Sequence, residues 1–234
     1  MKKNIILVTG GDGRFARVLK KQNKKLNLIF AKKNNCNILK ISSIIKCVKK
    51  NKPKYLMHCA GLSRPMNIHE KDINKSIDLN IIGTANITKV CKLFKIKLIY
   101  FSTGYVYSDK KLNSSEKDPV KPFNNYGLSK LGGECSVQMY NNSLILRLTM
   151  MEKPFAYSKA YTNLISNYMY HEDVIKILPK LINKKGIINI GGKLQSIYNF
   201  AKKNNPNIKK ARAKKNKKFP LNQSMSIKKL KKLW

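Results

Sequence analysis

Tyr126 and Lys130 stand four residues apart in the segment NNYGLSKLGGE. Residues at this spacing share one face of a helix, so we expect the Lys130 ammonium to lie beside the Tyr126 phenol. A neighbouring cation favours the phenolate and would lower the tyrosine pKa from about 10 toward neutrality. The pair predicts acid/base chemistry on a carbonyl or a carbinol. An exposed helix on which the pair is accidental is the alternative, because lysine is abundant in this chain.

The N-terminal segment predicts a site for a phosphate. The apolar run NIILV (residues 4–8) has the character of a buried parallel strand, and TGGDGRFA follows it directly. Glycines such as Gly10 and Gly13 allow a tight turn and a close approach of a pyrophosphate to the backbone. A helix starting after Gly13 would direct unpaired N–H groups at that phosphate. An ordinary strand-turn-helix corner is the alternative.

Apolar runs recur along the chain, with helix-length segments between most of them. This alternation predicts an α/β fold, with a doubly wound parallel sheet covered by helices on both faces. A chain of 234 residues can form one such domain with a small appended lobe. The runs cover residues 26–30, 55–59, 97–102, 143–148 and 187–190.

Longer blocks in a fixed order cover most of the chain. They are LVTGGDGRFARVL, PKYLMHCAGLSRP, SIDLNIIGTANITKVC, IYFSTGYVY, NNYGLSKLGGE, LILRLT, HEDVIKILPKLI, GIINIGGKLQSIYNFAK and FPLNQSMSIKKLKKL. Together they resemble the extended short-chain dehydrogenase/reductases, within the superfamily of NAD-dependent epimerases and dehydratases, and in particular the dTDP-4-dehydrorhamnose reductase type. The resemblance implies an NAD(P)-binding Rossmann core over residues 1–148. It implies a shortened substrate-binding portion over residues 149–234, with returning strand and helix elements and a basic tail.

The resemblance also implies a reaction, the reduction by NAD(P)H of a 4-keto group on a nucleotide-linked deoxysugar, in nucleotide-sugar and surface-polysaccharide biosynthesis. Thr103 would hydrogen-bond the C4 oxygen, Tyr126 would donate the proton, and Lys130 would also hold the nicotinamide ribose. The cofactor brings the hydride, so the protein supplies geometry and electrostatics. Two alternatives stay open, a nucleotide-sugar epimerase or dehydratase and a non-catalytic binding or regulatory subunit.

The same resemblance assigns further residues to the cofactor and to the substrate. After Arg147 the chain is shorter than is usual in the family, which leaves the sugar and base of the substrate open. Ser63 and Arg64 either touch substrate or only cap a loop. The implied cofactor contacts are Gly10, Asp12, Gly13, Arg14, Phe15, Cys59, Ala60, Gly61, Asn80, Tyr126 and Lys130, and the implied substrate contacts are Ser63, Arg64, Thr103, Gly104, Tyr105 and Arg147.

The residues after the second strand indicate the cofactor. About 20 residues past the glycine loop, an acidic side chain binds a ribose 2′-hydroxyl and a basic one accommodates a 2′-phosphate. Here Phe30 is followed by AKKNN, which contains no carboxylate. We therefore expect Lys32 to contact a 2′-phosphate, and NADP(H) to be preferred over NAD(H).

The net charge of +38, from 49 basic and 11 acidic residues, admits three explanations. It can reflect a drift of the whole proteome toward a few codons, steering of an anionic cofactor and substrate into a cleft, or a contact with nucleic acid or an anionic surface. The third would centre on the lysine-rich run 202–218, which lacks interleaved aromatic residues that could stack on bases. Nucleic-acid binding is therefore not expected, and the run can equally be a flexible loop before a helix over 224–233.

The five cysteines lack CxxC and Cys-His spacings, so neither a metal site nor a disulfide framework is expected. Reduced cysteines indicate the cytoplasm. No apolar stretch is long enough to span a bilayer, and the short run after Lys2 and Lys3 ends too soon for a signal peptide. The sequence allows a homodimer. His58 is expected to be packed or hydrogen-bonded, and Glu134 to support the helix that carries Lys130.

Overall fold

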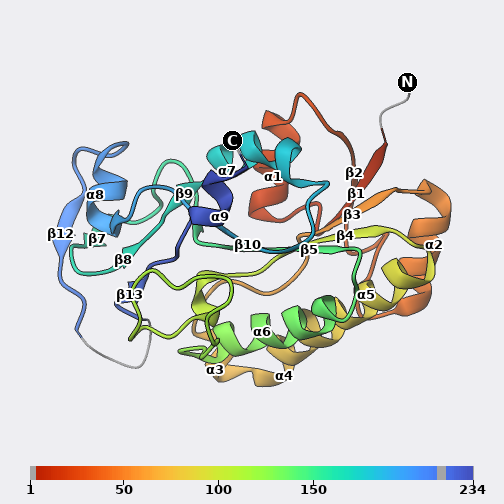
Figure 1. The fold of residues 1–234 in the computed structure, drawn as a ribbon, viewed down its shortest axis with the longest axis horizontal. Helices are drawn as coiled ribbons and strands as arrows, with labels where there is room; N and C mark the ends of the chain where they lie inside the picture. The colour runs from red at the N-terminus through yellow and green to blue at the C-terminus, as the bar shows by residue number, and fades with distance from the viewer. Residues whose placement is uncertain (1–3, 215–219, 234) are drawn as a thin grey trace.

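The computed structural model describes residues 4–214 and 220–233. Its centre is a six-stranded parallel sheet in the order β10-β5-β4-β3-β1-β2, with helices on both faces (Figure 1). This arrangement confirms the predicted doubly wound α/β fold. The strands are β1 (Ile5–Thr9), β2 (Asn27–Ala31), β3 (Tyr55–His58), β4 (Lys97–Phe101), β5 (Ser143–Leu148) and β10 (Gly186–Ile190).

The strands form where the chain is continuously apolar, because both faces of the sheet are covered. Side chains alternate between the faces along each strand. Ile6 and Val8 of β1 pack in one cluster with α1 (Arg14–Gln22) and α7 (His171–Leu181). Leu7 packs in the opposite cluster, against the helices α2, α5 and α6. Their bounds are α2 (Ile41–Asn51), α5 (Gly83–Leu93) and α6 (Asn125–Gln138).

The winding of the chain reverses next to β1. From β1 the chain passes to β2 on one side and then returns to β3 on the other. Open α/β sheets bind ligands at such a switch point, beyond the carboxyl ends of the strands. Thr9 and His58 end β1 and β3 and therefore mark where a ligand is expected.

The connection from β3 to β4 is helical over most of its length. It runs through two single-turn helices and a π-helical turn into α5, and a short 3-10 turn then follows β4. These elements are α3 (Ile68–Lys71), α4 (Ile73–Ser76), η1 (Ile77–Ile82) and η2 (Gly104–Val106).

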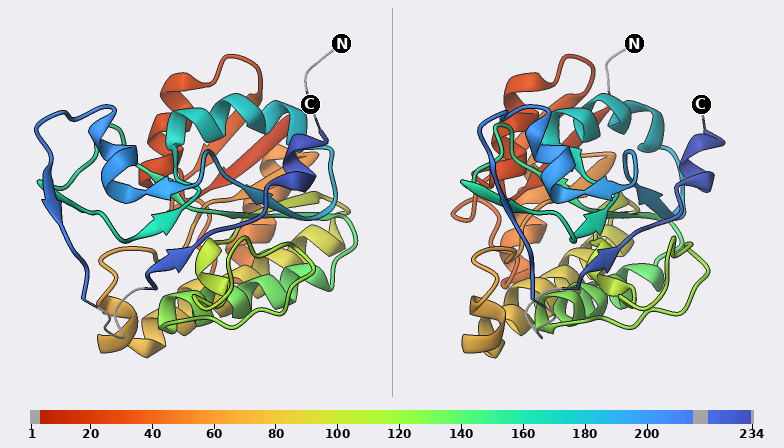
Figure 2. Two further views of the ribbon diagram at one scale, coloured as in Figure 1. Left: turned by 60° about the vertical axis from the view of Figure 1, so that its left-hand side comes forward. Right: turned by 90° about the vertical axis from the view of Figure 1, so that its left-hand side faces the viewer.

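A smaller lobe lies at one end of the molecule, and its views in Figure 2 show short strands around α8 (Ile197–Lys202). Its core is aromatic, with Tyr168, Tyr170 and Phe200 in contact. Three small sheets join its strands, in the orders β11-β8-β13, β12-β7 and β6-β9. The strands are β6 (Met150–Met151), β7 (Lys159–Tyr161), β8 (Ile165–Ser166), β9 (Met169–Tyr170), β11 (Gln195–Ser196), β12 (Lys209–Ala211) and β13 (Asn222–Gln223).

The C-terminal region differs from the expectation in two places. The helix expected over 224–233 is limited to α9 (Lys228–Lys231), because residues 224–226 exchange backbone hydrogen bonds with Ser114. Part of the lysine-rich run 202–218 is a strand and not a loop, since β12 pairs in parallel with β7. Residues 215–219 of that run lie outside the described residues. Among the helices that are described, none is both long and apolar enough to cross a membrane.

Candidate active site

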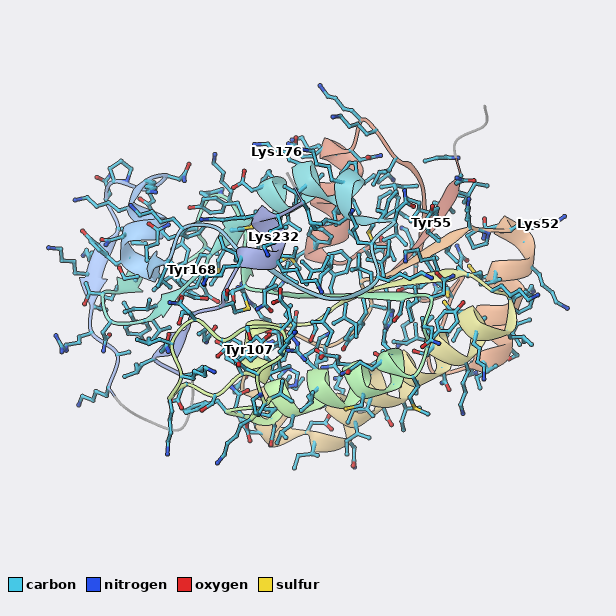
Figure 3. All side chains as sticks on the ribbon, viewed as in Figure 1. Lys52, Tyr55, Tyr107, Tyr168, Lys176 and Lys232 are labelled. Atoms are coloured by element: carbon cyan, nitrogen blue, oxygen red, sulfur yellow. The ribbon has the colours of Figure 1, made fainter. Side chains whose placement is uncertain are left out.

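A cavity of about 610 Å³ lies beyond the carboxyl ends of the central strands, and residues of the lobe form part of its lining. Tyr168 of the lobe, which is labelled in Figure 3, forms part of the cavity wall. Segments far apart in sequence meet here. Of the predicted residues, Gly10, Gly13, Arg14, Phe15, Cys59, Ala60, Gly61, Ser63, Arg64, Thr103, Tyr105, Tyr126 and Lys130 line this cavity.

The loop between β1 and α1 presents bare backbone to the cavity. Gly10 has φ +68°, and a Cβ there would lie 2.7 Å from backbone atoms of Ala60. The N–H of Gly13 donates to the carbonyl of Gly10 at 2.8 Å and closes the turn. Gly13 is also the N-cap of α1 and has no side chain to cap that helix. The first-turn N–H groups of α1 are thus available to a phosphate.

Thr103, Tyr126 and Lys130 all line the cavity, although they come from two elements. Thr103 follows β4, whereas Tyr126 and Lys130 lie on α6, whose N-cap Asn124 accepts a hydrogen bond from the Gly127 N–H at 3.0 Å. The Tyr126 phenol lies near enough to the Thr103 side chain for Thr103 to lower its pKa. A hydroxyl and a phenol placed in this way can together bind one carbonyl oxygen.

The protonation of Tyr126 is governed by burial. Burial raises its pKa to about 12, and the neighbouring Thr103 side chain acts in the opposite direction. Two rings enclose the phenol, that of Tyr105 at 5.4 Å and that of His69 at 5.1 Å between centroids. The expectation of a lowered tyrosine pKa is therefore wrong for this structure, because spacing on a helix reveals neighbours and not the loss of water. The phenol is protonated at neutral pH.

The pKa of Lys130 is shifted in the opposite direction. Burial lowers its pKa to about 8, while Cys59 and Glu134 act to raise it. Its Nζ lies 4.2 Å from the centroid of the Tyr100 ring. The ammonium is therefore held by a cation–π contact at the floor of the cavity, and it is still mostly protonated at pH 7.

The chain is also similar to known proteins, both in sequence and in structure. Residues 3–177 match the family described as the RmlD substrate binding domain. The chain belongs to this family. A solved structure of dTDP-4-dehydrorhamnose reductase from Bacillus anthracis, in complex with NADP, has the same fold, with a TM-score of 0.89 at 22% identity. That similarity covers 98% of this chain and 92% of the other.

Two curated relatives carry different names. Methionine adenosyltransferase 2 subunit beta from Danio rerio is 30% identical over 141 residues, which are 55% of this chain and 42% of that protein. The dTDP-D-glucose 4,6-dehydratase from Dictyostelium discoideum is 32% identical over 173 residues, 68% of this chain and 36% of that protein. The chain thus spans less than half the length of these curated relatives.

In this member of the RmlD substrate binding domain family, Arg147 lies beneath the cavity and not in its wall. It is 2% exposed, and its guanidinium forms an ion pair with Glu134, which is 0% exposed. Arg147 Nη1 donates to the Tyr107 hydroxyl at 2.8 Å, and Ser102 Oγ donates to Glu134 Oε2 at 2.7 Å. The structure therefore places Arg147 in a buried ion pair outside the lining of the cavity, and the expected substrate contact stays a prediction. Glu134 does anchor α6, as expected.

Asn80 also lies outside the lining of the cavity, and its expected contact with the cofactor stays a prediction. It is buried, and its Nδ2 donates to the Leu62 carbonyl and to Ser129 Oγ, each at 2.9 Å. Its Oδ1 accepts from the Leu62 N–H at 2.7 Å. Since Ser129 lies on α6, Asn80 ties the loop after β3 to the helix that carries Tyr126. It positions the site from behind the cavity wall.

Asp12, Lys32 and Gly104 complete the predicted set, and they lie outside the lining of this cavity. Lys32 Nζ forms an exposed ion pair with Asp12 Oδ1 at 3.2 Å, beside the glycine loop. Asp12 lines a second, adjoining cavity. A Cβ on Gly104 would meet Thr149 Oγ1 at 3.0 Å, so Gly104 allows a close backbone packing. The contact of Lys32 with a 2′-phosphate stays a prediction.

His58 is hydrogen-bonded, as expected. Its Nδ1 lies 2.8 Å from Thr9 Oγ1, and its Nε2 lies 3.2 Å from Thr84 Oγ1. Thr9 Oγ1 in turn accepts from the Ala60 N–H at 3.3 Å. Burial lowers the His58 pKa to about 3, so the ring is neutral and joins β1, β3 and α5 under the glycine loop.

The sequence analysis missed Glu152 and the aromatic wall of the lobe. Glu152 lines the cavity and contacts two of the predicted binding residues, Arg14 and Arg64. The wall includes Tyr157 and Tyr168. The scarcity of acidic residues, 11 in 234, is the one signal that could have drawn attention to Glu152.

Proposed function

We propose that the chain is an NADP(H)-dependent reductase of a 4-keto group on a nucleotide-linked deoxysugar. One observation carries the proposal. The neighbouring side chains of Thr103 and Tyr126 line the same cavity as the glycine loop, at the switch point of a doubly wound sheet. A dinucleotide at the loop and a carbonyl at the pair would meet inside that one cavity.

The residues present fit a dinucleotide. Gly10 and Gly61 both have positive φ, and a Cβ on either would lie 2.7 Å from Ala60 or 2.9 Å from Asn80 Oδ1. Side chains are thus excluded at the two loops that face the cavity, which leaves room for a diphosphate to approach the backbone. Exposed Lys32 beside the glycine loop supports NADP(H), and NADP is also what the Bacillus anthracis reductase contains.

Each of the chain's own groups would have a separate role in the reaction. When bound, the nicotinamide supplies the hydride. The Thr103 hydroxyl holds the C4 oxygen of the sugar, and the Tyr126 phenol gives its proton to that oxygen as the alcohol forms. A phenol with a pKa of about 12 is protonated at neutral pH, as a proton donor must be. The Lys130 ammonium donates hydrogen bonds to the ribose hydroxyls and adds positive charge at the floor of the cavity.

A non-catalytic subunit is the second candidate, because the Danio rerio relative is named as a subunit of methionine adenosyltransferase. Such a protein would bind a dinucleotide without turning over a keto-sugar. The placement of Thr103 and Tyr126 in one cavity favours the reductase, since a subunit used only for assembly does not need that pair.

The test is a titration of the purified protein with NADPH and NADH, followed by nicotinamide fluorescence. The double variant Lys32→Ala/Lys33→Ala should weaken NADPH binding by about tenfold and leave NADH binding nearly unchanged. Lys49→Ala/Lys50→Ala removes the same charge from the exposed end of α2 and serves as the control. Consumption of NADPH with a 4-keto nucleotide sugar then separates the reductase from a binding subunit. Binding of neither cofactor would refute the proposal.

A further inference from the structure

Glu152 sits between two arginines at the mouth of the cavity. Its Oε2 accepts a hydrogen bond from Arg64 Nη1 at 3.1 Å, and its Oε1 lies 3.7 Å from Arg14 Nε. The three side chains are 27 to 34% exposed. In a chain with 49 basic and 11 acidic residues, a carboxylate at this point is conspicuous. It supplies negative charge where the cavity otherwise presents two guanidinium groups.

The contacts around this carboxylate join three separate segments. Arg14 begins α1, and its Nη2 donates to Ser63 Oγ at 3.0 Å in the loop after β3. Arg64, in the same loop, reaches the segment after β6, where its guanidinium lies 5.8 Å from the centroid of the Tyr157 ring. Glu152 belongs to that segment. We call Arg14, Arg64 and Glu152 the clasp.

The clasp stands where two cavities adjoin. The residues that line both cavities are Gly13, Arg14, Gly61, Ser63, Arg64, Glu152 and Tyr157. The first cavity continues inward to Tyr126 and Lys130, and the second continues outward to Asp12 and Arg17. A ligand that extends from the glycine loop to Tyr126 therefore passes the clasp. Two guanidinium groups are a suitable partner for a diphosphate, which binds arginine by paired, charge-assisted hydrogen bonds.

We propose that Glu152 is an internal substitute for a ligand's diphosphate, and that the diphosphate displaces it from Arg14 and Arg64 on binding. The inference rests on the proposed function, because it takes the ligand to be a dinucleotide or a nucleotide sugar. The carboxylate keeps both arginines oriented while the site is free. It also selects among anions, because an anion must bind the two arginines more strongly than the Glu152 carboxylate does. A diphosphate does so through its higher charge, and a single inorganic phosphate competes less well.

The experiment compares Glu152→Gln with the wild-type protein. The amide keeps the size and the oxygen acceptor but removes the charge. ADP-ribose and thymidine diphosphate are the probes, and titration calorimetry at one fixed salt concentration measures their affinities. Losing the competing ion pairs should make binding of at least one probe about three- to tenfold tighter. A gain with ADP-ribose points to the dinucleotide diphosphate, and a gain with thymidine diphosphate points to that of the nucleotide sugar.

Two controls separate this effect from a change in net charge. Asp78→Asn removes one negative charge at an exposed position of η1 and should leave both affinities unchanged. Arg64→Gln should cost more affinity in the Glu152→Gln background than in the wild type, because only there is the arginine free of its internal partner. Thermal unfolding establishes that each variant is folded.

The outcomes distinguish this inference from the proposed function. Equal affinities for Glu152→Gln and the wild type, in a protein that binds NADPH, would overturn the inference and leave the function standing. If the wild type binds neither NADPH nor NADH, the function fails, and inorganic pyrophosphate then serves as the probe. Tighter pyrophosphate binding by Glu152→Gln would still support the clasp as a diphosphate site, and unchanged binding would overturn it.

Discussion

The Lys130 ammonium lies over the face of the Tyr100 ring, with 4.2 Å between Nζ and the ring centroid. Lys130 of α6 lines the cavity, whereas Tyr100 of β4 is fully buried and lies outside that lining. Tyr126, four residues before Lys130, packs instead against the rings of Tyr105 and His69. Lys130 and Tyr126 are thus four residues apart in sequence but contact different partners. The pKa of each is shifted.

Lys130 should make the stability of the protein depend on pH. Its pKa is about 8 in the fold, against an ordinary lysine pKa of 10.5. The unfolded chain therefore binds the proton more tightly, and the buried charge destabilises the fold fully below about pH 8. This cost disappears as the pH rises from 8 to 10.5. Lys130→Met should raise the free energy of unfolding at pH 7 by up to about 3 kcal/mol, and the gain should shrink toward pH 10.5.

Denaturant unfolding of both proteins across this pH range measures the effect. Lys89→Met, at an exposed position of α5, is the control and should differ from the wild type by an amount independent of pH. A gain for Lys130→Met that stays constant from pH 7 to 10.5 would contradict the depressed pKa.

Tyr126→Phe should lower turnover by roughly 100-fold or more and leave the affinity for NADPH nearly unchanged, because it removes the proton donor and little else. Tyr55→Phe is the matched control. Tyr55 lies at the opposite end of the sheet (Figure 3), where its hydroxyl donates to Asn183 Oδ1 at 2.7 Å. That variant should lose some stability and keep full turnover. Steady-state kinetics with a 4-keto nucleotide sugar decides, and undiminished turnover of Tyr126→Phe would remove the phenol from the mechanism.

Gly13→Val should abolish dinucleotide binding, with only a modest loss of stability. The residue has φ −67°, which valine tolerates, and its Cβ would contact the Gly10 carbonyl at 3.0 Å. The branched side chain would occupy the space of the diphosphate. Gly186→Val, at the start of β10, has φ +77° and open space around it. It should therefore cost stability and keep the affinity for NADPH. Fluorescence titration and thermal unfolding compare the two, and retained affinity in Gly13→Val would place the cofactor elsewhere.

Arg147→Met should destabilise the protein by about 3 to 5 kcal/mol, because it leaves the Glu134 carboxylate buried without its cation. The double variant Arg147→Met/Glu134→Gln should recover part of the loss, since the unpaired charge is then removed. Urea unfolding measures both. A stable Arg147→Met protein with a raised KM for the sugar would instead restore Arg147 to the substrate site.

Much of the fold was predictable because a parallel sheet leaves a simple trace in sequence. The strand β5 coincides with the predicted run 143–148, and β1 leads into the glycine loop as expected. The short β12 could not be predicted. Its lysines resemble a solvated loop, and it becomes a strand by pairing with β7, fifty residues earlier.

The candidate site was predictable where a residue has a fixed position in a sequence motif. Thr103, Tyr126 and the glycines of the loop are of this kind, and the structure brings them to one cavity. Arg147 shows the limit of such reasoning. Its partner Glu134 lies thirteen residues away on a different element, so only the packing of β5 against α6 reveals the pair. The direction of the Tyr126 pKa shift was missed for a related reason, because burial is a property of the folded chain.

The position of the strand β10 and the helix α7 in the sequence affects how the chain folds during its synthesis. Both lie late in the sequence, yet α7 packs on α1 and covers Phe15 and Leu19, next to the glycine loop. A ribosome finishes the loop within the first few seconds of translation, at about 5 to 20 residues per second, and α7 only much later. We therefore expect the nascent N-terminal half to emerge with an uncovered apolar face, which stays exposed until residues 171–190 have been synthesised.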